Sequence, residues 1–215
     1  MGMIPLAIRL QLTTVLLLLG AGSALGAGSP AVYEVRSGDN LSVIGVRFGV
    51  TVKDLKRANG LTSDLLSIGQ ELIIEKPFRR TRHDDVRWVR PSNRLGRVLR
   101  PYGQYKKGSV LMPRTGVDLV CSPGTQLVSP AHGVIRHVGP MDGFGLLVII
   151  EHGGGYATVM SPLDPERLTV TPGQAILRGD PVGRTGPPVD SADEPHLHLE
   201  LRRDDKAIKP DRLYK

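Results

Sequence analysis

The sequence predicts two folded parts, a small α+β module with the order strand, helix, helix, strand, and a following all-β antiparallel domain. Residues 41–59 show helical spacing with recognisable caps, whereas the apolar runs after residue 95 are short and separated by Gly and Pro turns. The chain has 26 Gly and 17 Pro among 215 residues, which suits many short strands and tight turns.

Residues 1–26 have the pattern of a signal peptide. Arg9 precedes the apolar run 12–19, and small residues follow at 24–27. This run is shorter than the about 20 residues that a membrane-spanning helix needs, so an uncleaved anchor is the alternative interpretation. We therefore expect an exported protein of the bacterial periplasm or cell envelope.

The net charge of +7 limits the classes of partner. An exported basic protein is suited to anionic envelope polymers or an acidic partner surface. Nucleic acid is the other common partner of a basic chain, but no nucleic-acid-binding motif is present. The single cysteine, Cys121, excludes a disulfide within the chain.

The small module is expected over residues 31–76. A strand at 33–36 is followed by a turn that caps a helix over 41–48. Thr51 and Asp54 form a capping-box pattern for a second helix, which should end at Asn59 and Gly60 before a return strand at 72–74.

The motifs at 33–41, 58–61 and 68–72 (Tyr-x-Val-x-Ser-Gly-Asp-Asn-Leu, Ala-Asn-Gly-Leu and Ile-Gly-Gln-x-Leu) together resemble the LysM domain. The resemblance implies binding of N-acetylglucosamine-containing glycans, peptidoglycan or chitin, in a shallow groove. The alternative is that these turns and apolar residues only close a small core. The groove residues that the resemblance implies are Gly38, Asp39, Asn40, Leu41, Leu65, Leu66 and Ile68.

Residues 77–95 are rich in arginine around a single Trp88, and their composition is that of a basic linker. The simpler interpretation is a solvated linker. The alternative is that its positive charge steers the protein toward anionic wall polymer. Trp88 is the candidate in this segment for packing on the second domain.

The second domain, residues 96–215, contains two histidines that share one face of a predicted strand. Side chains two positions apart emerge on the same face, so His196 and His198 point together while Leu197 and Leu199 enter the core. With the distant Asp118 they suggest a metal or acid–base site, although solvated or hydrogen-bonded histidines are the alternative.

This domain resembles the lysostaphin and LytM type of zinc peptidoglycan endopeptidases, on Gly-Val-Asp at 116–118, Gly-Phe-Gly at 143–145 and Pro-His-Leu-His-Leu-Glu at 195–200. Active members carry His-x-x-x-Asp, Tyr-x-His-Leu and His-x-His. The resemblance places Asp118 and His198 at zinc-ligand positions and His196 at a catalytic position.

Two required histidines are replaced. Arg114 stands four residues before Asp118, and Pro162 stands in the Tyr-x-His-Leu segment. A guanidinium has no lone pair for a metal, and a catalytic zinc needs three protein ligands. The sequence therefore predicts a degenerate domain with no cofactor. A zinc site would be possible only if His196 joined Asp118 and His198 as a third ligand.

The order of signal peptide, LysM, basic segment and degenerate LytM-type domain resembles the NlpD and EnvC type of murein hydrolase activators. The resemblance implies a non-catalytic regulator in cell-wall remodelling or cell separation. Its implied partners are peptidoglycan glycan strands and a murein hydrolase, for which an N-acetylmuramoyl-L-alanine amidase is the leading candidate. The expected partner-binding groove comprises Arg114, Asp118, Phe144, Tyr156, Pro162, His196 and His198.

Two other functions stay open at this point. One is a zinc peptidoglycan endopeptidase with a non-standard ligand set. The other is a structural wall-binding protein without a hydrolase partner. From the sequence, Arg114→Glu is expected to weaken partner binding without unfolding the domain.

Overall fold

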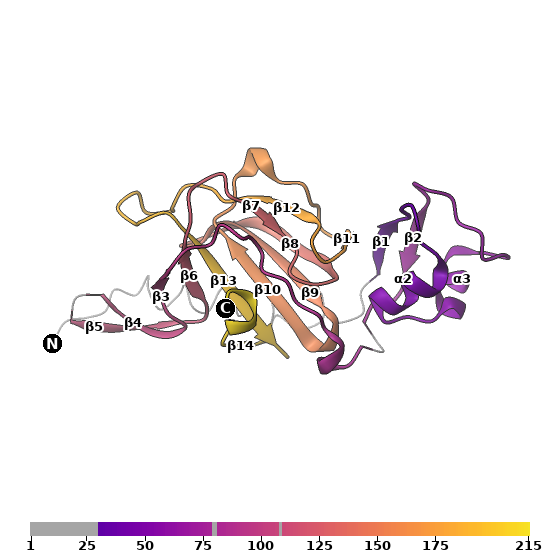
Figure 1. Ribbon diagram of the computed structural model, residues 1–215, viewed down its shortest axis with the longest axis horizontal. Helices are drawn as coiled ribbons and strands as arrows, with labels where there is room; N and C mark the ends of the chain where they lie inside the picture. The colour runs from indigo at the N-terminus through magenta and orange to yellow at the C-terminus, as the bar shows by residue number, and fades with distance from the viewer. Residues whose placement is uncertain (1–29, 79–80, 108) are drawn as a thin grey trace.

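The computed structural model describes residues 30–78, 81–107 and 109–215, so the predicted signal peptide over 1–26 lies outside the described residues. Both predicted classes are confirmed: a small α+β module precedes a domain dominated by one antiparallel sheet (Figure 1). No helix in the described part of the chain is long and apolar enough to cross a membrane.

The N-terminal module comprises β1 (Ala31–Glu34), α2 (Leu41–Phe48), α3 (Val52–Asn59) and β2 (Glu71–Ile74). Asn40 caps α2, since its side-chain oxygen accepts the Val43 N–H at 2.9 Å. Thr51 and Asp54 form the expected capping box of α3. The caps that the sequence carries thus fix both helix starts.

The module is joined to the second domain by backbone and core contacts. A two-stranded sheet is marginally stable alone, and here β1 runs beside Gln174 in a parallel bridge, with the Val32 N–H donating to the Gly173 carbonyl at 3.1 Å. Val134 and Ala175 of the second domain lie in the module's own hydrophobic cluster. The two parts therefore share a core.

The main sheet has eight strands in the order β11-β8-β9-β10-β13-β6-β3, with β14 also pairing with β13 (Figure 1). Most of its strands fall on the predicted apolar runs. Its strands are β3 (Val98–Arg100), β6 (Val117–Val120), β8 (Gly133–Met141), β9 (Gly145–His152), β10 (Tyr156–Ser161), β11 (Ala175–Ile176), β13 (His196–Arg203) and β14 (Lys206–Ile208).

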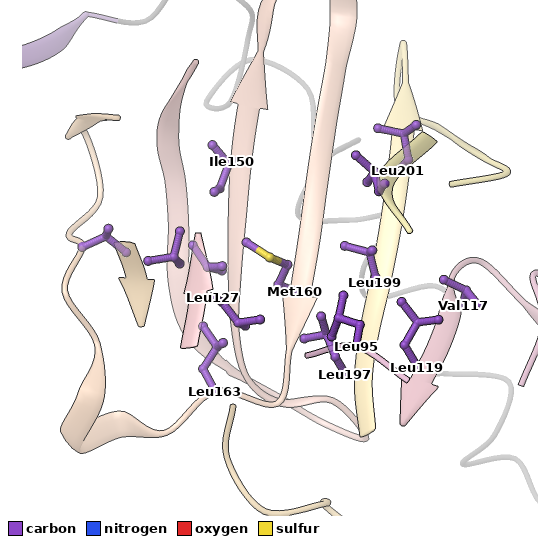
Figure 2. Packing of buried hydrophobic residues seen from close by; sticks show 14 of the residues in the cluster. Leu95, Val117, Leu119, Leu127, Ile150, Met160, Leu163, Leu197, Leu199 and Leu201 are labelled. Carbon is purple, nitrogen blue, oxygen red and sulfur yellow. The ribbon is translucent and has the colours of Figure 1, made fainter. Parts of the chain in front are cut away.

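Strand β13 separates an apolar face from a polar one. Leu197, Leu199 and Leu201 point into the main core, where Figure 2 shows Leu199 near Met160 and Leu197 near Leu119 of β6. The alternation of a strand then places the side chains between these leucines on the opposite face. The same alternation in β6 places Val117 and Leu119 in the core and turns Asp118 toward that polar face.

Two smaller strand pairs lie beside the main sheet. β7 (Gln126–Val128) pairs with β12 (Pro181–Arg184), and β4 (Gly103–Lys107) pairs with β5 (Val110–Arg114). The hairpin of β4 and β5 projects at the end of the domain opposite the N-terminal module (Figure 1). The sequence did not predict this hairpin, which delivers Arg114 to the start of the polar face.

In the described part of the arginine-rich segment, Trp88 packs on the second domain as expected, while Arg82, Arg87, Arg90 and Arg94 are exposed. The Trp88 ring meets the rings of His152 and Tyr156 edge-on, each with centroids 5.3 Å apart. The Val89 N–H donates to the Pro130 carbonyl at 2.8 Å, and Leu95 is buried in the main core. Single apolar residues inside a basic stretch can fix its position on a core. An average over the composition of the stretch hides them.

Candidate functional site

The polar face of β13 gathers the site residues through strand register. His198 lies opposite Asp118 of β6 on one side and opposite Ser161 of β10 on the other. Gly116 permits this arrangement, because a Cβ there would lie 2.7 Å from Cε1 of His198. The Gly-x-Asp pattern therefore lets the imidazole lie across the start of β6.

Asp118 is completely buried and is contacted by two guanidinium groups. Nη1 of Arg114 lies 2.7 Å from its Oδ1, and Nη1 of Arg100 lies 3.1 Å from its Oδ2. Arg100 also pairs with Asp193. The sequence correctly placed Arg114 beside Asp118, but it gave no signal for Arg100, which reaches the site from β3.

His198 is held between two carboxylates. Its Nδ1 lies 2.7 Å from Oδ1 of Asp118, and its Nε2 lies 3.3 Å from Oε1 of Glu200. Glu200 is itself fully buried and is also contacted by Thr115 and, at 2.9 Å, by Arg202. Both ring nitrogens of His198 are thus directed at acceptors.

The buried charges stabilise one another's ionised forms. Burial disfavours the imidazolium of His198, but the hydrogen bonds to Asp118 and Glu200 outweigh it and raise the pKa of His198 to about 9. Burial likewise opposes ionisation of both carboxyls, yet the His198 hydrogen bonds lower the pKa of Asp118 and of Glu200 to about 2. His198 is therefore an imidazolium at neutral pH.

The residues present do not fit the zinc that the resemblance implies. Nη1 of Arg114 lies 3.2 Å from Nδ1 of His198, so a permanent cation stands beside both remnant ligands. In the described part of the chain, no three His, Cys, Asp or Glu side chains form a group that could hold a metal ion.

His196 does not complete the set. Its Nδ1 lies 2.7 Å from the Glu194 carbonyl, and its Nε2 is 3.8 Å from Oδ2 of Asp118. That Asp118 oxygen is already contacted by Arg100. A three-ligand arrangement would need both arginines to leave the carboxylate.

The rim of this groove is apolar. The Phe144 ring meets the His198 ring edge-on with centroids 5.1 Å apart. A Cβ on Gly145 would lie 3.1 Å from Val189 and 3.3 Å from Pro162, so these two side chains lie close to the residue that follows Phe144. Sequence reasoning missed Val189, and an isolated valine in the polar loop after Gly186-Pro187-Pro188 was its only signal.

Tyr156 was expected at this rim, and the structure places it elsewhere. It begins β10 and lies opposite Arg203, whereas Ser161 at the other end of the strand lies opposite His198. Five residues along a strand span about 17 Å. Tyr156 instead packs under Trp88 and receives a 3.2 Å hydrogen bond from Arg212, so it is a core residue.

The predicted glycan groove of the module divides into structural and exposed residues. The Leu41 side chain is buried, Asn40 caps α2, and Asp39 accepts hydrogen bonds from Tyr33 and Arg47. Leu41 and Asp39 are therefore engaged within the module, whereas Asn40 caps α2 and stays exposed. Gly38 is exposed, Leu66 is half-buried, and Leu65 and Ile68 expose 85% and 74% of their surface.

Comparison with known proteins assigns both parts. Residues 33–75 match the LysM domain, and residues 112–210 match Peptidase family M23. The chain thus carries a region that matches the LysM domain, followed by a region that matches the M23 family. These two matches confirm the resemblances found in the sequence, and the M23 match covers the site residues from Arg114 to His198.

Several relatives share one or both domains. The chain is 29% identical to the uncharacterized lipoprotein YgeR of Escherichia coli over 95% of this chain and 91% of that protein. It is 27% identical to the murein hydrolase activator EnvC of Escherichia coli, over 54% of this chain and 26% of EnvC. The matched stretch thus corresponds to about a quarter of EnvC.

Solved structures support the fold. A zinc-containing peptidase from Vibrio cholerae aligns with a TM-score of 0.51 and 21% identity, over 68% of this chain and 44% of that one. The SpoIIQ–SpoIIIAH pore-forming complex also aligns, with a TM-score of 0.51 and 18% identity, over 60% of this chain and 90% of the matched chain. At these identities the likeness concerns the M23 fold alone.

Proposed function

We propose that the protein is a non-catalytic, peptidoglycan-bound regulator that activates a cell-wall hydrolase, an N-acetylmuramoyl-L-alanine amidase. The LysM domain holds the chain on peptidoglycan glycan strands in the envelope, and the groove of the M23 domain binds the hydrolase. The relatives named as a lipoprotein and as a murein hydrolase activator support this envelope role.

The position of Arg114 carries the proposal. Its guanidinium lies within 3.2 Å of both remnant ligands, Asp118 and His198, where a zinc ion would need open coordination. Pro162 removes the second catalytic histidine and offers no proton donor or acceptor in its place. These two replacements support a site that binds a partner rather than one that hydrolyses peptidoglycan.

The groove keeps features that suit protein binding. Phe144 and Val189 form an apolar rim around a polar floor whose charges are already paired. Interfaces commonly combine apolar anchors with such satisfied polar groups. Activation requires tighter binding to the open form of the hydrolase than to its closed form. A ligand with equal affinity for both forms would not shift the equilibrium between them.

The test uses the purified protein and dye-labelled sacculi. We expect no dye release by the protein alone, and release above the amidase's own rate when a candidate amidase is added. Zinc bound in a one-to-one ratio, with chelator-sensitive release by the protein alone, would instead establish a peptidoglycan endopeptidase. Binding to sacculi without stimulation of any hydrolase would establish a structural wall-binding protein.

A further inference from the structure

A second group of arginines lies outside the groove, in a cleft of about 480 Å³ on the flank of the M23 domain. The segment after Trp88 forms one side of this cleft, and the β7–β12 pair forms the other. Arg90, Arg94 and Arg184 line it together with polar side chains, and none of the described lining residues is Asp or Glu. We call this the arginine cleft.

The arginine cleft is built on fixed elements. Arg184 belongs to β12 and lies opposite Gln126 of β7 in the strand register. The facing segment is held to β7 by the Val128 N–H, which donates to the Pro91 carbonyl at 2.8 Å. Because main-chain bonds hold both walls, the arginines are carried on a preorganised surface.

The guanidinium groups in the cleft contact main-chain oxygens. Arg184 donates to the Gly124 carbonyl at 2.8 Å, and Arg90 lies 3.5 Å from the Leu95 carbonyl. Among the residues that the structure describes, no ion pair joins Arg90, Arg94 or Arg184 to a carboxylate. A guanidinium has five N–H donors, so these contacts leave several for a ligand.

We propose that the arginine cleft binds the carboxylates of peptidoglycan peptide stems. Three like charges around one cleft favour an anion, and the planar guanidinium fork matches a carboxylate with two parallel hydrogen bonds. The volume accommodates part of a short peptide. The proposal rests on the proposed function in one respect: a LysM domain bound to glycan keeps stem carboxylates at high local concentration.

The test is an NMR titration of the full-length protein with a free stem tetrapeptide, which lacks the sugars that LysM recognises. Arg94→Glu and Arg184→Gln should each weaken binding about tenfold, as expected for loss of one charge-assisted hydrogen-bonding group. Arg94 is exposed, so its replacement leaves the fold intact, as an unchanged Tm would verify. Arg167→Glu, an exposed position outside the cleft with the same charge change, is the matched control.

Two results would overturn the cleft assignment. One is peptide binding that is unchanged in Arg94→Glu, or that persists when the peptide carboxylates are amidated. The other is Arg94-dependent binding to phosphatidylglycerol vesicles without peptide binding, which would assign the cleft to lipid phosphate.

Amidase stimulation by the unmodified protein separates this proposal from the proposed function. Stimulation without peptide binding would overturn the cleft alone. Peptide binding through Arg94 without stimulation would support the cleft and overturn the regulator.

Discussion

The groove and the arginine cleft both contain arginines, but only the groove arginines lie against carboxylates. Arg114 and Arg100 both contact the buried Asp118. In the cleft, Arg184 is held by a main-chain carbonyl instead. The groove arginines are paired with carboxylates within the chain, whereas no ion pair joins the described cleft arginines to a carboxylate. We therefore propose that the groove recognises a partner mainly by shape and the cleft mainly by charge.

The largest expected loss of stability comes from breaking the ion network of the groove. Asp118→Ala leaves Arg114, Arg100 and the His198 imidazolium without their shared carboxylate. Removing one partner of a buried ion network costs about 3–5 kcal/mol. Urea unfolding should show this loss, while Arg184→Gln in the cleft should change the unfolding free energy by only about 0.5 kcal/mol. Equal effects at both sites would contradict the comparison.

The same network makes Arg114→Glu unsuitable as a probe of partner binding, which corrects the expectation drawn from the sequence. The Arg114 side chain is only 17% exposed and touches Asp118, so a glutamate there would face a buried carboxylate. Val189 is exposed at the rim, and its substitution changes the surface without breaking the network.

Arg114→His is the next largest change, because it replaces the cation by a third ligand. With Asp118 and His198 it recreates a three-ligand set. At zinc concentrations about a hundredfold above Kd, the variant should gain about 2.7 kcal/mol of stability over its metal-free form. Thermal unfolding with and without zinc measures this gain, and Arg114→Gln is the control that lacks a ligand. No zinc response in Arg114→His would show that more than Arg114 has been lost from the site.

A smaller, pH-dependent effect is expected at His152, away from the groove. Burial lowers the pKa of His152 to about 4, and the ring bonds to Thr158 and the His132 carbonyl. The unfolded chain takes up this proton below about pH 6.5, so stability should fall as the pH drops from 6.5 to about 4.

His152→Gln tests this slope. Unfolding measured across the same pH range should depend less on pH in the variant. Part of the slope should remain, because burial also lowers the pKa of His132 to about 4. An unchanged slope would assign the pH dependence to other groups.

The smallest effect is expected at the ion pair between the two domains. Arg36 and Asp180 are 2.8 Å apart, but Arg36 is about half exposed. Such pairs contribute about 1 kcal/mol or less. Arg36→Ala should therefore lower Tm only slightly and keep a single unfolding transition, because the shared core around Val134 and Ala175 remains. Two separate transitions would show that the ion pair, rather than the core, joins the domains.

The sequence predicted what depends on local pattern. The caps at Asn40 and Thr51 fixed the helices, and the four-residue spacing put Arg114 beside Asp118. It missed what depends on long-range approach. Arg100 and Val189 reach the groove from segments whose own patterns do not indicate it.

Tyr156 was expected in the groove, but its position at the far end of β10 removes it from the site. In the segment 77–95, the expected packing of Trp88 on the second domain is confirmed, whereas the basic composition did not indicate the buried Leu95. The sequence does not contain the distance that separates Tyr156 from His198.

The central claim is that the rim of the M23 groove binds a hydrolase, and the most direct test is an affinity measurement with a candidate amidase. We predict that the full-length protein binds the amidase and that Val189→Glu weakens binding about tenfold, as for an interface anchor. Ile73→Glu, at an exposed apolar position in the LysM domain, should leave the affinity unchanged. Equal affinity for the unmodified protein and Val189→Glu would contradict the claim.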